Sequence, residues 1–174
     1  MPRMRDGKAR LIGLVAAIVV LVMDQGSKFY ALGVLDLEFS GPVTISPYID
    51  LVLVWNRGIS YGLFQQNADL GRYLLVALSA GAAIGFSIWL WRSRRLLPAL
   101  AIGLLVGGAI GNGIDRFFRG AVVDFILLHW GTWNWYVFNI ADAAIVAAVA
   151  LLLSDSWLGN AQLVKTSAEK EPSL

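Results

Sequence analysis

Apolar residues dominate four long stretches of the chain. The stretches run from Leu11 to about Leu32, from Tyr73 to Trp91, from Leu96 to Ile114 and from Trp135 to Leu153. A helix needs about 20 residues to cross a bilayer core of about 30 Å, so each stretch is long enough to span a membrane. The pattern predicts an all-α membrane protein with four transmembrane helices.

The first stretch also resembles a signal peptide, because basic residues precede it. No small-x-small cleavage pattern follows its apolar run, which leads directly into Met23-Asp24-Gln25. We therefore interpret this stretch as an uncleaved first helix.

Basic residues are distributed unevenly among the segments that the spans separate. Four lie in the N-terminal tail, three in the turn Arg92–Arg95 and two in the C-terminal tail, whereas segments 33–72 and 115–134 have two each. Basic residues are enriched on the cytoplasmic side of membrane proteins. The distribution predicts that both termini and the Arg92–Arg95 turn are cytoplasmic, and that segments 33–72 and 115–134 lie on the opposite, outer side.

The outer segment 33–72 contains two short β-prone runs, Val43-Thr44-Ile45 and Leu51–Trp55, with Gly-Pro and Ser-Pro pairs at their ends. These runs predict a small β-containing part between the first two helices. We expect one membrane domain over residues 1–157, followed by a polar cytoplasmic tail without fixed structure over residues 158–174.

Glycines recur every four residues in two spans. Gly103, Gly107 and Gly111 share one face of the third span, and Gly81 and Gly85 share one face of the second. Small residues at this spacing allow helix backbones to approach closely in lipid. The pattern predicts tight helix packing at both faces.

Composition narrows the classes of function. The chain is 57% hydrophobic and only 15% charged, which excludes disordered, collagen-like and coiled-coil proteins. A net charge of +2 from scattered residues argues against a nucleic-acid partner. With no cysteine and one histidine, thiol chemistry and common zinc sites are excluded, and we expect no metal and no cofactor.

Polar residues within the spans converge on one depth. Asp24 lies about 13 residues into the first span, or about 20 Å from its cytoplasmic end, which is the outer half of the membrane. Asn112 lies near the outer end of the third span, and Asn139 and Asp142 lie in the first turns of the fourth. Because polar groups in lipid are costly, this convergence indicates a functional site.

Neighbouring residues suggest different roles for these side chains. Asp24 can pair with Lys28 four residues later, so a structural and a functional role are equally open. Asp142 has no basic residue within one turn, and Asn139 shares its face, which favours a functional role.

A second polar group follows the third span. Asp115 can pair with Arg119 four residues later, which favours a structural role. Arg116 shares a helix face with Asn112, where it could hold a carboxylate or a lipid phosphate.

Asp124 is placed differently, within the apolar run 121–128. Desolvation in such surroundings disfavours the charged form of a carboxyl. If Asp124 meets Asp142 near the outer surface, the two cannot easily ionise together, and one keeps its proton. Such a pair can activate water and polarise a peptide carbonyl, as in aspartic proteases.

Five motifs give the chain a family resemblance over about residues 11–157. In order, they are Asp24-Gln25-x-x-Lys28, Asn56-x-Gly58-x-x-x-Gly62, Gly107-Gly108-x-x-Gly111-Asn112-x-x-Asp115-Arg116, Val122-Val123-Asp124-Phe125 and Phe138-Asn139-x-Ala141-Asp142. With these motifs the chain resembles lipoprotein signal peptidase (signal peptidase II), an aspartic protease of the bacterial inner membrane.

The resemblance implies an endopeptidase that cuts diacylglyceryl-modified prolipoproteins just before the lipidated cysteine and releases the signal peptide. It implies an active site toward the periplasm, contact with membrane lipids and binding of the inhibitor globomycin. The catalytic pair would be Asp124 and Asp142. The residues that bind substrate or support the site would be Asn56, Gly58, Gly108, Asn112, Arg116, Asn139 and Ala141. Asp24, Lys28 and Asp115 would support the fold.

The chain departs from the family pattern at Ile59-Ser60-Tyr61, where members often have two small residues and Phe. This departure bears on substrate fit and not on the catalytic pair. Two other classes are alternatives. A small proton- or cation-coupled transporter would place its acids near the midplane and show repeats, and a non-enzymatic scaffold would not need the polar motifs.

Overall fold

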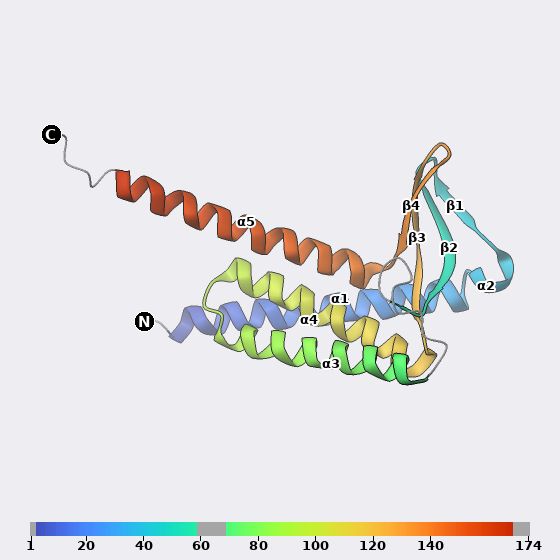
Figure 1. Cartoon of the computed structure of the whole chain (residues 1–174), viewed down its shortest axis with the longest axis horizontal. Coiled ribbons are helices and arrows are strands. Elements are labelled where there is room, and N and C mark those ends of the chain that lie inside the picture. The colour runs from blue at the N-terminus through green and yellow to red at the C-terminus, as the bar shows by residue number, and fades with distance from the viewer. Residues whose placement is uncertain (1–2, 59–68, 169–174) are drawn as a thin grey trace.

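The computed structural model describes residues 3–58 and 69–168. Four long helices lie side by side, and a sheet stands across one end of the bundle (Figure 1). The elements in chain order are α1 (Arg3–Gly33), α2 (Leu37–Ser40), β1 (Val43–Ser46), β2 (Ile49–Asn56), α3 (Asp69–Arg92), α4 (Leu96–Arg119), β3 (Val122–Trp130), β4 (Trp133–Phe138) and α5 (Ile140–Ala168).

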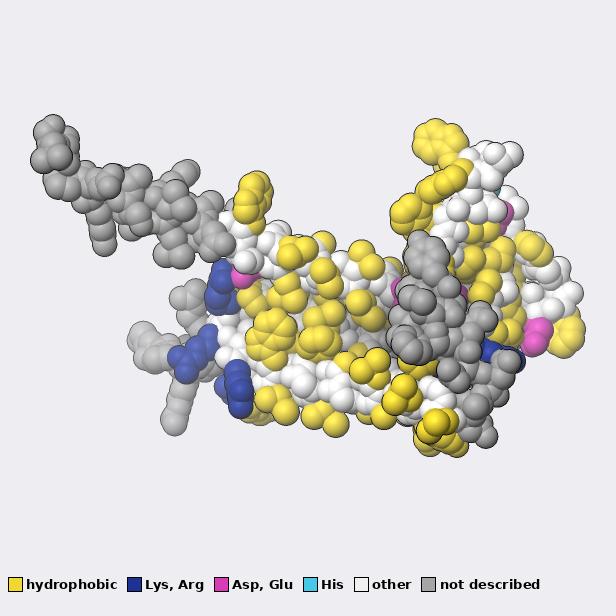
Figure 2. Space-filling view, viewed as in Figure 1, with side chains coloured by type: hydrophobic (Ala, Val, Ile, Leu, Met, Phe, Trp, Pro, Cys, Tyr) yellow, Lys and Arg dark blue, Asp and Glu magenta, His cyan; other side chains and the backbone are white. Residues whose placement is uncertain are grey.

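The four long helices are apolar enough and long enough to cross a membrane. Within the described residues, the candidate spans are Gly7–Gly33, Leu70–Arg92, Leu96–Arg119 and Ile140–Trp157. Hydrophobic side chains cover the visible surface of these helices, and most visible Lys and Arg side chains gather at the end far from the sheet (Figure 2). The predicted set of four membrane helices is therefore confirmed.

Helix α4 is the centre of the bundle, because α1, α3 and α5 all pack against it. Its glycines make this possible. A Cβ at Gly107 would lie 2.6 Å from the Ala17 carbonyl oxygen of α1, and a Cβ at Gly103 would overlap the backbone of Gly13. The predicted close packing along the Gly103–Gly111 face is thus confirmed.

The matching prediction for α3 is wrong. A Cβ at Gly81 or Gly85 would meet nothing within 4 Å, so these glycines face away from the bundle. Helix α3 instead turns its buried residues Leu75, Ala83 and Leu90 inward. Four-residue spacing identifies a shared helix face, but it does not say whether that face meets another helix.

The sheet has four antiparallel strands in the order β1-β2-β3-β4. Strand β3 pairs with β2 through Asn56 and Val122, and with β4 through Trp130 and Trp133. The sheet joins the bundle through a cluster in which Val123 and Phe125 pack with Ala31 and Leu37, from the end of α1 and from α2.

Two parts of this sheet correct the sequence interpretation. Strands β3 and β4 come from the segment between α4 and α5, so the protein is not all-α and its β structure is not confined to residues 33–72. The fourth span does not begin at Trp135, because Trp133–Phe138 is a strand and helix α5 starts at Ile140. Aromatic and β-branched residues favour strands, and Gly131, at φ 59°, allows the hairpin turn.

The expected tail also differs in part. Helix α5 continues to Ala168, so the expectation of a segment without fixed structure is wrong for residues 158–168. Residues 169–174 lie outside the described part of the chain.

Candidate active site

The predicted site residues meet where the sheet joins α4 and α5. Asp124 lies on β3, Asp142 in the first turn of α5 and Asn112 on α4, and Asn139 directly precedes α5. Asp124 and Asn139 are fully buried, whereas Asp142 is partly exposed. Segments far apart in the sequence therefore bring two carboxylates into one polar cluster.

The start of helix α5 fixes the carboxylate of Asp142. The Asp142 N–H donates to Asn139 Oδ1 at 2.9 Å, and the Asn139 N–H donates to Asp142 Oδ2 at 3.4 Å. This reciprocal pattern is a capping box, which satisfies free backbone donors at a helix N-terminus. Asn112 Nδ2 donates to the other oxygen, Asp142 Oδ1, at 2.8 Å. Both oxygens of Asp142 are thus held in place by this network.

Asp124 is held from two sides. Asn139 Nδ2 donates to its Oδ1 at 2.6 Å, and Asn56 Nδ2, from the end of β2, donates to its Oδ2 at 3.0 Å. The same Asn139 nitrogen also donates to Asn112 Oδ1 at 3.2 Å. Asn139 therefore contacts both acids and connects them with Asn112.

The pKa of Asp124 is raised to about 7, chiefly by burial and further by the nearby charge of Asp142. Hydrogen bonds from Asn56 and Asn139 and the charge of Lys28 oppose this shift without cancelling it. A carboxyl with such a pKa carries a proton for much of the time near neutral pH, as the apolar run around it suggested.

This pKa predicts that the folded protein becomes less stable as the pH rises from about 4 to about 7. A carboxyl whose pKa rises on folding binds its proton more tightly in the folded state, so its stabilising contribution is complete below 3.8 and is lost as the pH rises through about 7. Thermal unfolding in detergent across this range measures the effect. The Asp124→Asn variant lacks the titration and should show a smaller decline. An equally steep decline in the variant would contradict the assignment.

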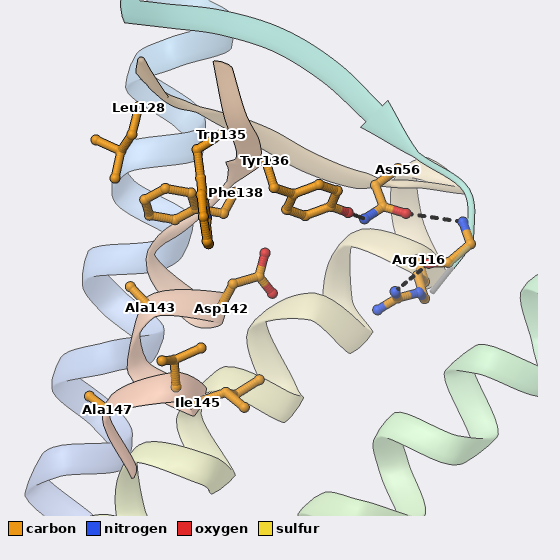
Figure 3. Close-up of a pocket in the computed structure, with 12 residues that line it drawn as sticks. Asn56, Arg116, Leu128, Trp135, Tyr136, Phe138, Asp142, Ala143, Ile145 and Ala147 are labelled. Carbon is orange, nitrogen blue, oxygen red and sulfur yellow. Dashed lines mark hydrogen bonds between the residues drawn. The ribbon is translucent and has the colours of Figure 1, made fainter. Parts of the chain in front are cut away.

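A pocket of about 630 Å³ opens beside the pair, and Asp142 lines it (Figure 3). Asn56, Gly58, Tyr136 and Arg116 form its polar side. Its apolar side comes from the sheet and from α5, through Leu128, Trp135, Phe138, Ala143, Ile145, Val146 and Ala147. The pocket thus offers one accessible carboxylate next to an apolar surface.

Arg116 contacts backbone carbonyls in the described structure. Its Nη2 donates to Gly58 O at 3.2 Å and its Nη1 to Asn112 O at 3.3 Å, and its Nε is buried without a hydrogen-bond partner there. Arg116 therefore ties the chain after β2 to α4. Asn56 Oδ1 accepts the Gly58 N–H at 3.1 Å and fixes the same turn. The residues Ile59-Ser60-Tyr61 lie outside the described part of the chain.

The three residues expected to support the fold form a buried charged cluster. Lys28 Nζ lies 2.7 Å from Asp24 Oδ2 and 2.7 Å from Asp115 Oδ2, and all three side chains are fully buried. Arg119 pairs with Asp115, as the four-residue spacing indicated. Lys28 Nζ also lies 3.4 Å from Asn112 Oδ1, which connects this cluster with the acid pair.

Gly108 and Ala141 are not among the residues that line the pocket. A Cβ at Gly108 would lie 2.8 Å from the Ala141 carbonyl oxygen, so Gly108 allows α4 to approach α5. Ala141 is fully buried. Their contribution is the spacing of the helices that carry Asn112 and Asp142.

Two residues of the network received no role from the sequence. The Tyr136 hydroxyl accepts a hydrogen bond from Asn56 Nδ2 at 3.0 Å, and Gln25 Nε2 donates to Asp24, Gly111 O and Asp115 at 3.1–3.3 Å. Gln25 stands in the first motif beside Asp24, and its place in an apolar span was the signal for a role in this network. Tyr136 gave no signal, because β4 was interpreted as part of a helix.

The fold and the site together define a multi-pass membrane protein with a carboxylate pair at one end of its helix bundle. Among the described residues, no group of three or more His, Cys, Asp or Glu side chains could hold a metal ion. The family model of signal peptidase (SPase) II matches residues 16–158. The chain belongs to the signal peptidase II family.

Relatives support this membership over most of the chain. The lipoprotein signal peptidase of Methylorubrum extorquens (strain PA1) is 55% identical over 144 residues, which cover 83% of this chain and 84% of that protein. The lipoprotein signal peptidase of Nitrobacter hamburgensis is 49% identical over 164 residues, covering 92% and 96%. A solved structure described as a bacterial membrane enzyme has a TM-score of 0.72 at 25% identity and covers 93% of both chains.

Family membership identifies the chain as a signal peptidase and a multi-pass bacterial membrane protein. The transporter alternative is not favoured, because the family model and the relatives are peptidases. The resemblance drawn from the five motifs is confirmed.

Proposed function

We propose that the chain is an aspartic endopeptidase that removes the signal peptide from diacylglyceryl-modified prolipoproteins, cutting just before the lipidated cysteine. The observation that carries the proposal is the Asn139-bridged pair of acids, of which Asp124 is buried and Asp142 faces the pocket. The relatives are lipoprotein signal peptidases, which gives the substrate class.

In the proposed mechanism, one acid is ionised and the other protonated when the peptide binds. The ionised carboxylate takes a proton from water as the water oxygen attacks the scissile carbonyl carbon. The protonated carboxyl donates to the carbonyl oxygen, and the tetrahedral intermediate collapses when the cysteine nitrogen receives a proton from the pair. The raised pKa of Asp124 suits a pair that shares one proton near neutral pH.

The polar residues around the acids then have positioning roles. Asn112 and Asn139 hold the carboxylates, and Asn56 holds Asp124 from the sheet. Arg116 and Gly58 shape the pocket wall under which the peptide would lie. The apolar side of the pocket suits the acyl chains of the lipidated cysteine, with surrounding membrane lipid completing it, and a globomycin-type inhibitor would bind in the same pocket.

An electrophoretic mobility-shift assay tests the function. Purified protein in detergent is mixed with a diacylglyceryl-modified prolipoprotein, and the cleaved lipoprotein migrates faster. We expect cleavage of the lipidated precursor and no cleavage of its unlipidated form. Globomycin should block the cleavage. An aspartic mechanism also predicts that EDTA and serine- or thiol-directed reagents leave activity intact. Loss of activity in EDTA with recovery in zinc would refute the aspartic mechanism.

We also propose that the pocket opens toward the periplasm from the inner membrane, with both termini in the cytoplasm. Basic residues flank the spans at the N-terminus and in the Arg92–Arg95 turn, and most visible basic side chains gather at the end far from the sheet (Figure 2). The substrate's lipidated cysteine would lie in the outer leaflet, level with Asp142.

This orientation predicts the behaviour of reporter fusions. A phosphatase reporter that is active only in the periplasm should be inactive when fused after Arg94, and active when fused near Gly41, because the two sites lie at opposite ends of the membrane spans. A cytoplasmic reporter at the same sites serves as the control and should give the inverse pattern. Phosphatase activity after Arg94 would reverse the proposed orientation.

A further inference from the structure

The first turn of α5 has an anchor on another helix, besides its own capping box. The Ala141 N–H donates to Asp24 Oδ1 of α1 at 3.0 Å, and Ala141 directly precedes Asp142. The first backbone N–H groups of a helix have no partner within the helix, and a negative charge near them is stabilising. The Asp24 carboxylate supplies both a partner and a charge.

Asp24 reaches α5 because α4 has no side chain in the way. A Cβ at Gly111 would lie 2.5 Å from Asp24 Oδ2 and 3.2 Å from Asp24 Cγ. It would lie 3.6 Å from the Cβ of Ala141, so Gly111 stands between the two partners. Glycine at this position leaves room for the carboxylate to pass from α1 to α5.

The carboxylate of Asp24 is itself held firmly. Its Oδ2 lies 2.7 Å from Lys28 Nζ and accepts from Gln25 Nε2 at 3.1 Å, which leaves Oδ1 directed at the Ala141 N–H. Lys28 has a second carboxylate partner in Asp115 at 2.7 Å. Asp115 thus also balances the charge of Lys28. Pairing with Lys28 alone therefore does not explain why Asp24 Oδ1 accepts the hydrogen bond from α5.

We propose that Asp24 is a positioning residue for peptide cleavage: it fixes the first turn of α5, and with it the carboxylate of Asp142, through the Ala141 N–H and the gap at Gly111. The proposal rests on the proposed function, in which Asp142 acts on the substrate. It assigns Asp24 a role in the reaction in addition to the structural role implied by the family resemblance.

The test compares steady-state kinetics of Asp24→Ala with the wild type on the lipidated precursor. A misplaced Asp142 should lower kcat by about 100-fold, because a displacement of about 1 Å costs that much in other enzymes, while KM stays within about 2-fold. Asp155→Asn is the matched control, since Asp155 holds the far end of α5 through Arg95 at 2.7 Å. It should leave kcat unchanged.

Hydrogen–deuterium exchange gives a readout that does not depend on activity. In Asp24→Ala, the amides at the start of α5 should exchange at least about 10-fold faster, and those in the middle of α4 should not change. The proposal is overturned if the start of α5 keeps its protection and kcat its value, or if KM alone changes. If the wild type does not cleave the precursor, the proposed function fails, and the exchange result still decides whether Asp24 holds α5.

A second variant covers the case in which Asp24→Ala does not fold. Gly111→Ala keeps every charge and displaces the Asp24 carboxylate, so it should lower kcat and loosen the start of α5 in the same way. Gly85→Ala is its control, because a Cβ there meets nothing within 4 Å. Equal kcat and equal exchange in the two glycine variants would overturn the proposal.

Discussion

Asp124→Asn and Asp142→Asn are each expected to lower cleavage of the lipidated precursor by about 10³-fold or more, in line with the loss of a general acid or base. The substitution is nearly isosteric, and it removes a charge that is buried in Asp124 and partly buried in Asp142. An amide can neither take a proton from water nor donate one to the leaving nitrogen as a carboxyl does. The variants should remain folded and inserted, and precursor should accumulate.

The mobility-shift assay measures this loss, with Asp155→Asn as the folded control. The double variant should be no worse than either single variant, because residues that act as a unit do not have additive effects. The wild-type pH–rate profile should be bell-shaped, with two apparent pKa values that belong to the pair. Near wild-type cleavage by Asp142→Asn would disprove the assignment and direct attention to Asp24 or Asp115.

Lys28→Met is expected to destabilise the folded protein by about 3–5 kcal/mol, the usual cost of removing one partner from a buried ion pair. Lys28 lies 2.7 Å from carboxylate oxygens of both Asp24 and Asp115, and all three side chains are fully buried. Without Lys28, Arg119 would be the one remaining ionic partner of the two buried carboxylates among the residues that the structure describes.

Thermal unfolding in detergent measures this cost. Arg95→Gln is the control, because Arg95 is 67% exposed in its pair with Asp155, and an exposed ion pair contributes about 0–1 kcal/mol. Adding Asp24→Asn to Lys28→Met should recover part of the loss, since it removes one unpaired charge. A Lys28→Met protein as stable as the Arg95→Gln control would show that the cluster does not stabilise the fold.

The sequence by itself determined the membrane helices and the position of the candidate active site. Long apolar runs permit few structures other than spanning helices, because lipid leaves backbone groups no other partners. Polar residues are costly in these helices, so Asp24, Asn112 and Asp142 marked the site from their depth alone. The pattern Asn139-x-x-Asp142 also contained the capping box, since its bonds join residues three apart in the chain.

Only the tertiary structure decided which segments meet. Strand β4 is apolar and adjoins an apolar helix, so hydropathy could not separate the strand from the helix. The pairing of β4 with β3 separates them. The two glycine faces have the same spacing, yet only the Gly103–Gly111 face meets other helices, because α4 and not α3 is central. The contacts of Lys28 with Asp115 and of Asp24 with Ala141 join residues 87 and 117 positions apart, and no local pattern encodes such distances. These contacts form only when the helices pack together.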